Sequence, residues 1–166
     1  MSRTHAILAF TVLLCASCVA QASDFDASFD WVAVGNFGPL YDSKTQDGFT
    51  LSPGDYTVTA SLERTFKILT FRTQVGEFLY QDEIPSIHRE NDFYALLTAM
   101  DRFGEDRWAL VVLGGVGYYN VTQQVDFHVG LGFDYRVHGP WMVRGEAVYH
   151  HEVESVAVTI GGGYMF

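Results

Sequence analysis

The chain has 166 residues, of which 48% are hydrophobic, and a formal net charge of −10. This acidic balance argues against a nucleic-acid-binding protein and against a polybasic protein of the membrane surface. The length suits a single domain. Because the acidic residues are dispersed along the chain, they fit charged loops better than an acidic tail.

The N-terminal segment predicts a secretory signal peptide over residues 1–22. It has a positively charged start, an apolar run from Ala6 to Ala20, and a small-x-small cleavage site at Ala20-Gln21-Ala22. Both cysteines leave with it, so the mature domain, 23–166, cannot rely on disulfides. A lipoprotein anchored through Cys18 is the alternative. Either reading places the protein among exported proteins.

Period-2 alternation recurs along the mature chain and predicts β-strands between turn residues. The first segment, near Phe29–Phe37, is apolar on both faces, so the sequence does not show which face points inward. The second and third, Tyr56–Arg64 and Ile68–Gly76, set apolar residues opposite polar ones. The fourth and fifth, near Asp92–Met100 and Arg107–Tyr119, are again apolar on both faces.

The last three segments alternate most regularly. VDFHVGLGFDYRV, Val125–Val137, keeps one apolar face over more than about ten residues, the length of a tilted membrane strand. WMVRGEAVYH, Trp141–His150, and VAVTIGGGYMF, Val156–Phe166, bring the count to eight. An even number is what a closed single-chain membrane barrel needs, and closure removes sheet edges that lipid cannot satisfy. We expect an all-β, eight-stranded antiparallel transmembrane β-barrel.

The connections follow the pattern of such barrels in the first half of the chain. Long polar or charged links near 38–53 and 81–91 alternate with short turns, as outer loops alternate with periplasmic turns. The second half has only short links. We therefore expect Tyr41–Asp47 and Gln81–Asn91 to be the main contact surfaces.

Aromatic residues fall near the ends of the predicted strands, which is typical of the two girdles of a bilayer protein. The alternative is a soluble β-sandwich or lipocalin-like barrel with its aromatics in the core. The expected girdle residues are Trp31, Trp108, Tyr135 and Trp141 at the periplasmic rim and Tyr118 and Tyr149 at the outer rim.

GLGFDYRVHGPWMVRGEAVYH followed by VAVTIGGGYMF resembles the small outer-membrane β-barrels of the OmpA/OmpX type. The resemblance implies a monomer in the bacterial outer membrane, surrounded by lipid and lipopolysaccharide. It also implies that periplasmic chaperones and the barrel-assembly machinery are partners, and that the terminal strand is the assembly signal. The residues of that signal are Val158, Ile160, Tyr164 and Phe166.

The polar faces of the predicted strands carry charges that a barrel would turn inward. The interior of an eight-stranded barrel is about filled by its own side chains, and buried charges must pair. We expect a structural charge network; a narrow ion path is the alternative, because glycines at 114, 115, 117, 130 and 132 thin the interior. The network residues are Glu63, Arg72, Asp126, His128, Asp134, Arg144 and Glu146.

A catalytic alternative rests on the last hairpin. A hydrolase needs a hydroxyl nucleophile, a base and a carboxylate. Here His150 or His151, Ser155, and Glu152 or Glu154 supply these types. Lipid A deacylases with eight strands use His-x-Ser, whereas Glu152 stands two residues after His150.

We expect neither catalytic residues nor a cofactor. A metal site from the adjacent histidines is disfavoured, because neighbouring side chains in a strand diverge. The predicted function is a non-enzymatic structural or surface-interaction role in the cell envelope. The alternatives are a small low-conductance channel and a lipid A-modifying hydrolase.

Overall fold

The computed structural model describes residues 30–42, 50–66, 69–79, 92–105, 107–120 and 122–166. The predicted signal peptide and most of the two predicted contact segments lie outside the described residues. Among the described residues, no helix is long and apolar enough to cross a membrane.

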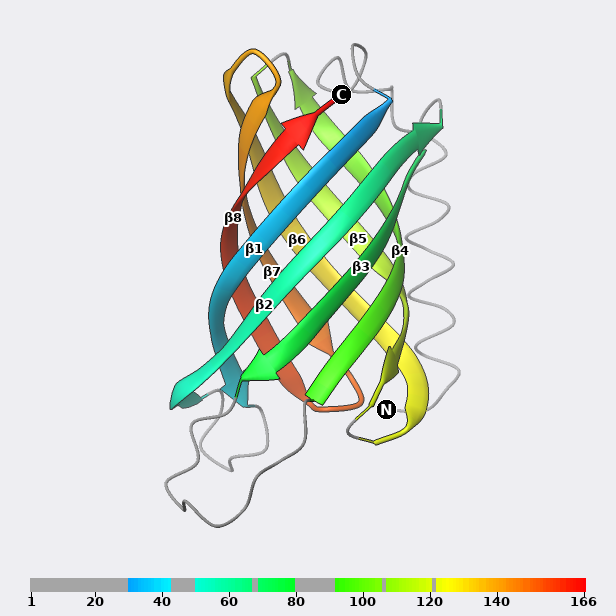
Figure 1. The fold of residues 1–166 in the computed structure, drawn as a ribbon, viewed down its shortest axis with the longest axis vertical. Helices are drawn as coiled ribbons and strands as arrows, with labels where there is room; N and C mark the ends of the chain where they lie inside the picture. Colours follow the sequence, from blue (N-terminus) through cyan, green and yellow to red (C-terminus); the bar gives the residue numbers. More distant parts are fainter. Residues whose placement is uncertain (1–29, 43–49, 67–68, 80–91, 106, 121) are drawn as a thin grey trace.

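Eight antiparallel strands close into a barrel in chain order, and pairing of the first strand with the last completes it (Figure 1). The predicted strand number, orientation and closure are confirmed. The strands are tilted against the long axis of the barrel (Figure 1), as closure of a sheet requires. They are β1 (Trp31–Asp42), β2 (Thr50–Phe66), β3 (Leu69–Leu79), β4 (Asp92–Glu105), β5 (Trp108–Tyr119), β6 (Gln124–His138), β7 (Trp141–His150) and β8 (Ser155–Met165).

The two ends of the barrel differ, and we name them by what they contain. At the terminal end β1 begins and β8 finishes, and the backbones of Trp31 and Phe166 exchange hydrogen bonds of 3.0 and 2.9 Å. This end is uppermost in Figure 1, and the opposite end is the loop end. At the terminal end the turn from β6 to β7 contains Gly139 at φ +54°, a conformation that glycine adopts without strain.

The strands present apolar side chains outward and polar ones inward. Val75, Leu131 and Ile160 are 61%, 64% and 67% exposed, whereas Arg72 and Arg144 are fully buried. A soluble barrel would show the reverse, because its apolar side chains would meet inside. The soluble alternative is therefore wrong for this fold.

The first, fourth and fifth strands, whose inward side the sequence left open, also alternate between inward and outward side chains. They carry large apolar residues on both sides. Val34 and Leu113 point inward and are buried, whereas Phe37, Leu97 and Val116 point outward and are about half exposed. The inward apolar residues of these segments form packed layers inside the barrel. Which side of these strands points inward therefore depends on where apolar side chains pack together inside the barrel.

Apolar side chains fill the lumen near both ends. The layer at the terminal end consists of Val32, Val34, Ala109, Met142 and Met165. The layer at the loop end consists of Leu40, Phe78, Tyr94, Leu96, Tyr119 and Ala157. Between these layers lie the buried polar and charged side chains and a third apolar cluster, which consists of Met100, Val111, Leu113 and Val148.

Candidate functional site in the barrel lumen

Six charged side chains meet in the middle of the lumen, and we call them the ionic layer. They are three carboxylates and three arginines, all at most 5% exposed: Glu63, Asp134, Glu146, Arg72, Arg102 and Arg144. Because the two signs balance, the layer carries no formal net charge. A buried charge without a partner would be far more unfavourable.

Glu63 on β2 is the centre of this layer. Its carboxylate accepts hydrogen bonds from Nη2 of Arg102 on β4 and from Nη1 of Arg144 on β7. A further bond of 3.2 Å comes from Nη2 of Arg144. Since β2 and β7 are not neighbours in the barrel, these bonds cross the lumen and tie opposite walls together.

Asp134 on β6 holds Arg144 in a bidentate pair. Nε and Nη2 of Arg144 donate to the two carboxylate oxygens, each at 2.6 Å. Nε of Arg102 reaches the same carboxylate at 3.0 Å. The parallel geometry of such a fork makes it stronger and more directional than a single charged hydrogen bond.

Glu146 on β7 pairs with Arg72 on β3. Nη1 of Arg72 donates to Oε2 of Glu146 at 2.7 Å, and Nδ2 of Asn36 donates to Oε1 at 2.7 Å. The same Arg72 nitrogen lies 3.9 Å from Glu63, which connects this pair to the rest of the layer. Within the described residues, Nε and Nη2 of Arg72 have no hydrogen-bond partner.

The structure brings together five of the seven residues predicted for the charge network and places the other two elsewhere. Asp126, near the loop end, accepts from the backbone N–H of Phe127 at 2.7 Å and makes no ion pair within the ionic layer. His128 bonds to the hydroxyl of Thr98 at 2.8 Å. These two placements correct the prediction. An inward-pointing side chain can lie at any height along the barrel axis, so pointing inward does not by itself bring it to the ionic layer.

Arg102 and Asn36 belong to the layer but were missed by the sequence analysis. The fourth predicted segment stopped at Met100, whereas β4 continues to Glu105. Continuing the inward alternation from Tyr94 through Met100 by one more step reaches Arg102. Extending the predicted strand beyond Met100 and keeping the two-residue alternation would therefore have identified Arg102.

The glycines do not open the lumen, contrary to the expectation that they thin it. A Cβ added at Gly117 would lie 2.3 Å from Cδ2 of Leu96, and one at Gly115 would lie 2.0 Å from the carbonyl oxygen of Leu97. At Gly130 it would meet Cδ1 of Leu113 at 3.1 Å. Neighbouring atoms already occupy this space, so these glycines permit close packing.

A second polar group, the histidine layer, lies between the ionic layer and the loop end. It consists of His128 with Thr98 and His150 with Tyr119. His150 Nδ1 and the Tyr119 hydroxyl are 3.0 Å apart, and the two imidazole centroids are 6.3 Å apart. The rings of Phe78 and Tyr94 pack against His150 at centroid distances of 5.5 and 5.2 Å.

The histidines of the catalytic alternative lie in two different environments. His150 points into the lumen beneath aromatic rings and is 1% exposed. His151 lies in the following turn, where its ring stacks on Phe127 at 4.5 Å. Ser155 stands opposite His150 in the strand register and is also buried.

The described part of the chain also contains no group of three or more histidine, cysteine or acidic residues placed to hold a metal ion. Of the adjacent histidines in the last hairpin, His150 is buried in the lumen, whereas His151 lies in the turn and is partly buried.

The predicted girdle residues lie near the two ends of the barrel. Trp108 and Tyr135 face each other in the register at the terminal end, 41% and 43% exposed, and Trp141 there is 58% exposed. Trp31, also at that end, is partly buried. At the loop end Tyr118 is 39% exposed and Tyr149 is partly buried.

The residues of the predicted assembly signal share the outward face of β8 and the C-terminus. Val158 and Tyr164 are each 41% exposed, Ile160 is 67% exposed and Phe166 is 56% exposed. Gly162 takes the remaining outward position between Ile160 and Tyr164.

Several solved structures share this fold over most of their length, but their sequences are only distantly similar. A designed transmembrane β-barrel matches with a TM-score of 0.61 and 13% identity over 82% of this chain and 95% of its own. Ail, the attachment invasion locus protein of Yersinia pestis, matches with a TM-score of 0.56 and 14% identity over 83% and 99%. The N-terminal β-barrel domain of Pseudomonas aeruginosa OprF matches with 0.56 and 16% over 83% and 98%.

No protein-family model and no curated protein matches the sequence. The structural likenesses show the fold, which is that of the small eight-stranded transmembrane barrels known from bacterial outer membranes. The expected resemblance to this class is confirmed at the level of fold.

Proposed function

We propose that this chain is a non-enzymatic, monomeric barrel of the bacterial outer membrane with a structural or surface-interaction role in the cell envelope. One observation carries the proposal: the lumen is filled by a charge-balanced ionic layer, by the histidine layer and by three apolar clusters, while the outward face is apolar. Such a barrel anchors its loops in the membrane without offering a wide aqueous path.

The apolar exterior supports lipid and lipopolysaccharide as the immediate surroundings. In this proposal the terminal end faces the periplasm and the loop end faces outward, because long loops are extracellular in such barrels. The predicted contact segments, Tyr41–Asp47 and Gln81–Asn91, would then face outward and form the contact surface. The neighbour Ail is described as an attachment invasion locus protein, and an adhesive role is one form this surface interaction takes.

A low-conductance channel is the second candidate function. It is favoured by Arg72, whose Nε and Nη2 are buried without a partner among the described residues. Buried donors without a protein partner are groups to which water can bind.

Planar-bilayer recording of the purified, folded protein separates these two functions. We expect no steps of current above the empty bilayer, and none for Arg72→Ala or Glu146→Ala. Steps in the wild type that change in size or ion selectivity in either variant would replace our proposal with the channel.

A second experiment tests the outer-membrane assignment through the terminal strand. The outward alternation of β8 ending at Phe166 supports a role as the signal for barrel-assembly machinery and periplasmic chaperones. We expect deletion of Phe166 to lower the heat-modifiable barrel in outer-membrane fractions several-fold. The matched control is Val137→Ala, since Val137 is 55% exposed on another strand. Equal amounts of folded barrel in both variants would contradict the assembly role.

A further inference from the structure

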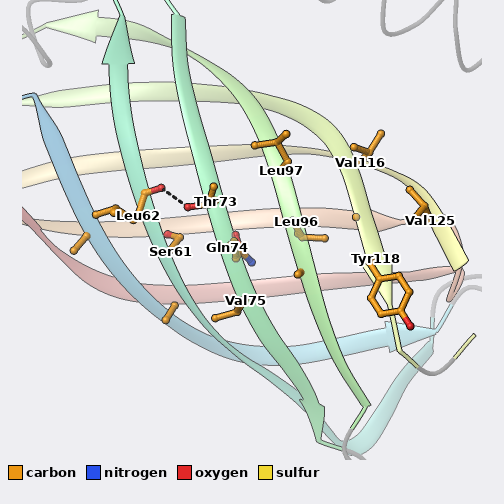
Figure 2. Close-up of a pocket in the computed structure, with 14 residues that line it drawn as sticks. Ser61, Leu62, Thr73, Gln74, Val75, Leu96, Leu97, Val116, Tyr118 and Val125 are labelled. Atoms are coloured by element: carbon orange, nitrogen blue, oxygen red, sulfur yellow. Dashed lines mark hydrogen bonds between the residues drawn. The ribbon is translucent and has the colours of Figure 1, made fainter. Parts of the chain in front are cut away.

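An apolar groove of about 730 Å³ runs over the outer face of β1 to β6 (Figure 2). Its floor contains small outward residues, Ala33, Ala60 and Ala95, which stand lower than the side chains around them. Leu62, Thr73, Leu97 and Val116 lie in one row across neighbouring strands, and Val75, Tyr118 and Val125 lie further along (Figure 2). The hollow therefore results from small residues in a wall of larger ones.

Arg64 lies on the same outward face of β2, closer to the terminal end. Its guanidinium carbon is 4.9 Å from the ring centroid of Trp31 and 4.8 Å from that of Phe66. In such contacts the negative face of an aromatic ring attracts the cation. Two rings thus position an exposed cation that has no ion pair among the described residues.

The positioned cation and the groove are continuous. Trp31 pairs with Arg64 in the strand register, and the next outward pair, Ala33 with Leu62, already lines the groove. From Arg64 to Ala60 the strand advances about 13 Å, which lies within the ~15 Å depth of one leaflet's hydrocarbon. A charged group that continues into an apolar hollow within that distance matches the two parts of a membrane lipid.

We propose that Arg64 and this groove bind one glycerophospholipid, with its phosphodiester on the guanidinium and an acyl chain along Ala33, Ala60 and Ala95. A guanidinium donates two parallel hydrogen bonds to phosphate oxygens, which suits it to this headgroup better than a lysine. The choice of a phospholipid rests on the proposed orientation, in which the terminal end faces the periplasm. The headgroup then lies at the inner leaflet.

Native mass spectrometry of the detergent-folded protein tests this site with phosphatidylglycerol and with diacylglycerol, which has the same chains but no phosphate. The site variants are Arg64→Gln, which removes the charge, and Ala60→Phe, which fills the groove. The matched controls are Arg107→Gln, an exposed arginine at the same end, and Ala147→Phe, an outward alanine on β7 outside the groove. All these positions face outward or lie in a turn, and heat-modifiability checks that each variant is folded.

We expect the wild type and both controls to retain one phosphatidylglycerol and much less diacylglycerol. Arg64→Gln should retain the phospholipid about tenfold less, the effect of losing one charge-assisted contact. Ala60→Phe should also lower retention, because its ring occupies the space of the acyl chain. If all variants retain phosphatidylglycerol as well as the wild type does, the lipid binds without a specific site and the proposal is wrong. If the wild type retains diacylglycerol as well as phosphatidylglycerol, Arg64 does not bind the phosphate. Because the measurement is made in detergent, it does not depend on the cellular location proposed above.

Discussion

The ionic layer and the histidine layer lie next to each other in the same lumen, yet they are built differently. The ionic layer uses full charges shared among several partners, so that Glu63 and Asp134 each serve two arginines. The histidine layer uses single hydrogen bonds between an imidazole and a hydroxyl group, supported by aromatic rings. Similar burial thus gives a connected network in one layer and separate pairs in the other.

This difference predicts how each layer fails when one member is removed. In the ionic layer, loss of one charge leaves its partners buried and unbalanced. In the histidine layer, loss of one side chain leaves a single polar atom without a partner, which is less unfavourable.

The largest effect is expected for Glu63→Gln. This change keeps the size of the side chain but leaves Arg102 and Arg144 with one carboxylate fewer, so we expect the free energy of unfolding to fall by about 3–5 kcal/mol. Urea unfolding of the protein in lipid vesicles measures it.

The double variant Glu63→Leu/Arg102→Met restores the balance of charges and is the control for this prediction. It should lose clearly less stability than the sum of its two single variants, because the remaining charges still pair. Additive losses would mean that the two side chains act separately and that the layer is not a network.

A smaller effect is expected for Arg144→Lys. The charge remains, but an ammonium group cannot form the fork to Asp134, so we expect a loss of about 2 kcal/mol in the same measurement. Arg136→Lys, a change of an arginine outside the ionic layer, is the comparison. If both lysine variants unfold at the same urea concentration, the fork contributes nothing specific.

The smallest effect is expected for the histidine layer. His150→Phe leaves the Tyr119 hydroxyl without its partner and should reduce the free energy of unfolding by about 1–2 kcal/mol. Adding Tyr119→Phe removes both polar groups and should recover most of that loss, since apolar replacement of a whole pair is nearly neutral. A further loss in the double variant would show that the aromatic packing, and not the hydrogen bond, holds His150.

Much of the barrel follows from alternation and turn spacing. The faces of the second, third, sixth, seventh and eighth strands are as predicted, because the inward side of each carries mostly polar or small residues. The large apolar exceptions are Phe78, Met142, Val148 and Met165. The first, fourth and fifth strands are apolar on both sides, so their facing depends on the apolar layers that close the lumen. For example, nothing local distinguishes Leu96, which is buried, from Leu97, which is 53% exposed.

The candidate site was predicted less completely than the fold. Five of its residues were predicted because they alternate with outward apolar residues along their strands: Glu63, Arg72, Asp134, Arg144 and Glu146. Asp126 has the same parity, but it lies at a different level and joins no other network member. Parity assigns a side chain to a face, whereas the tilt and stagger of the strands set its height along the lumen.

The sequence by itself determined eight strands, their order and an inside-out distribution of polarity, because these depend on the two-residue repeat of a strand. Only the tertiary structure decided which charges meet, since Glu63 and Arg144 are 81 residues apart in sequence. It also placed Arg64 beside the groove, through the pairing of β1 with β2. The physical reason is that contacts across a closed barrel depend on the registers of all its strands together.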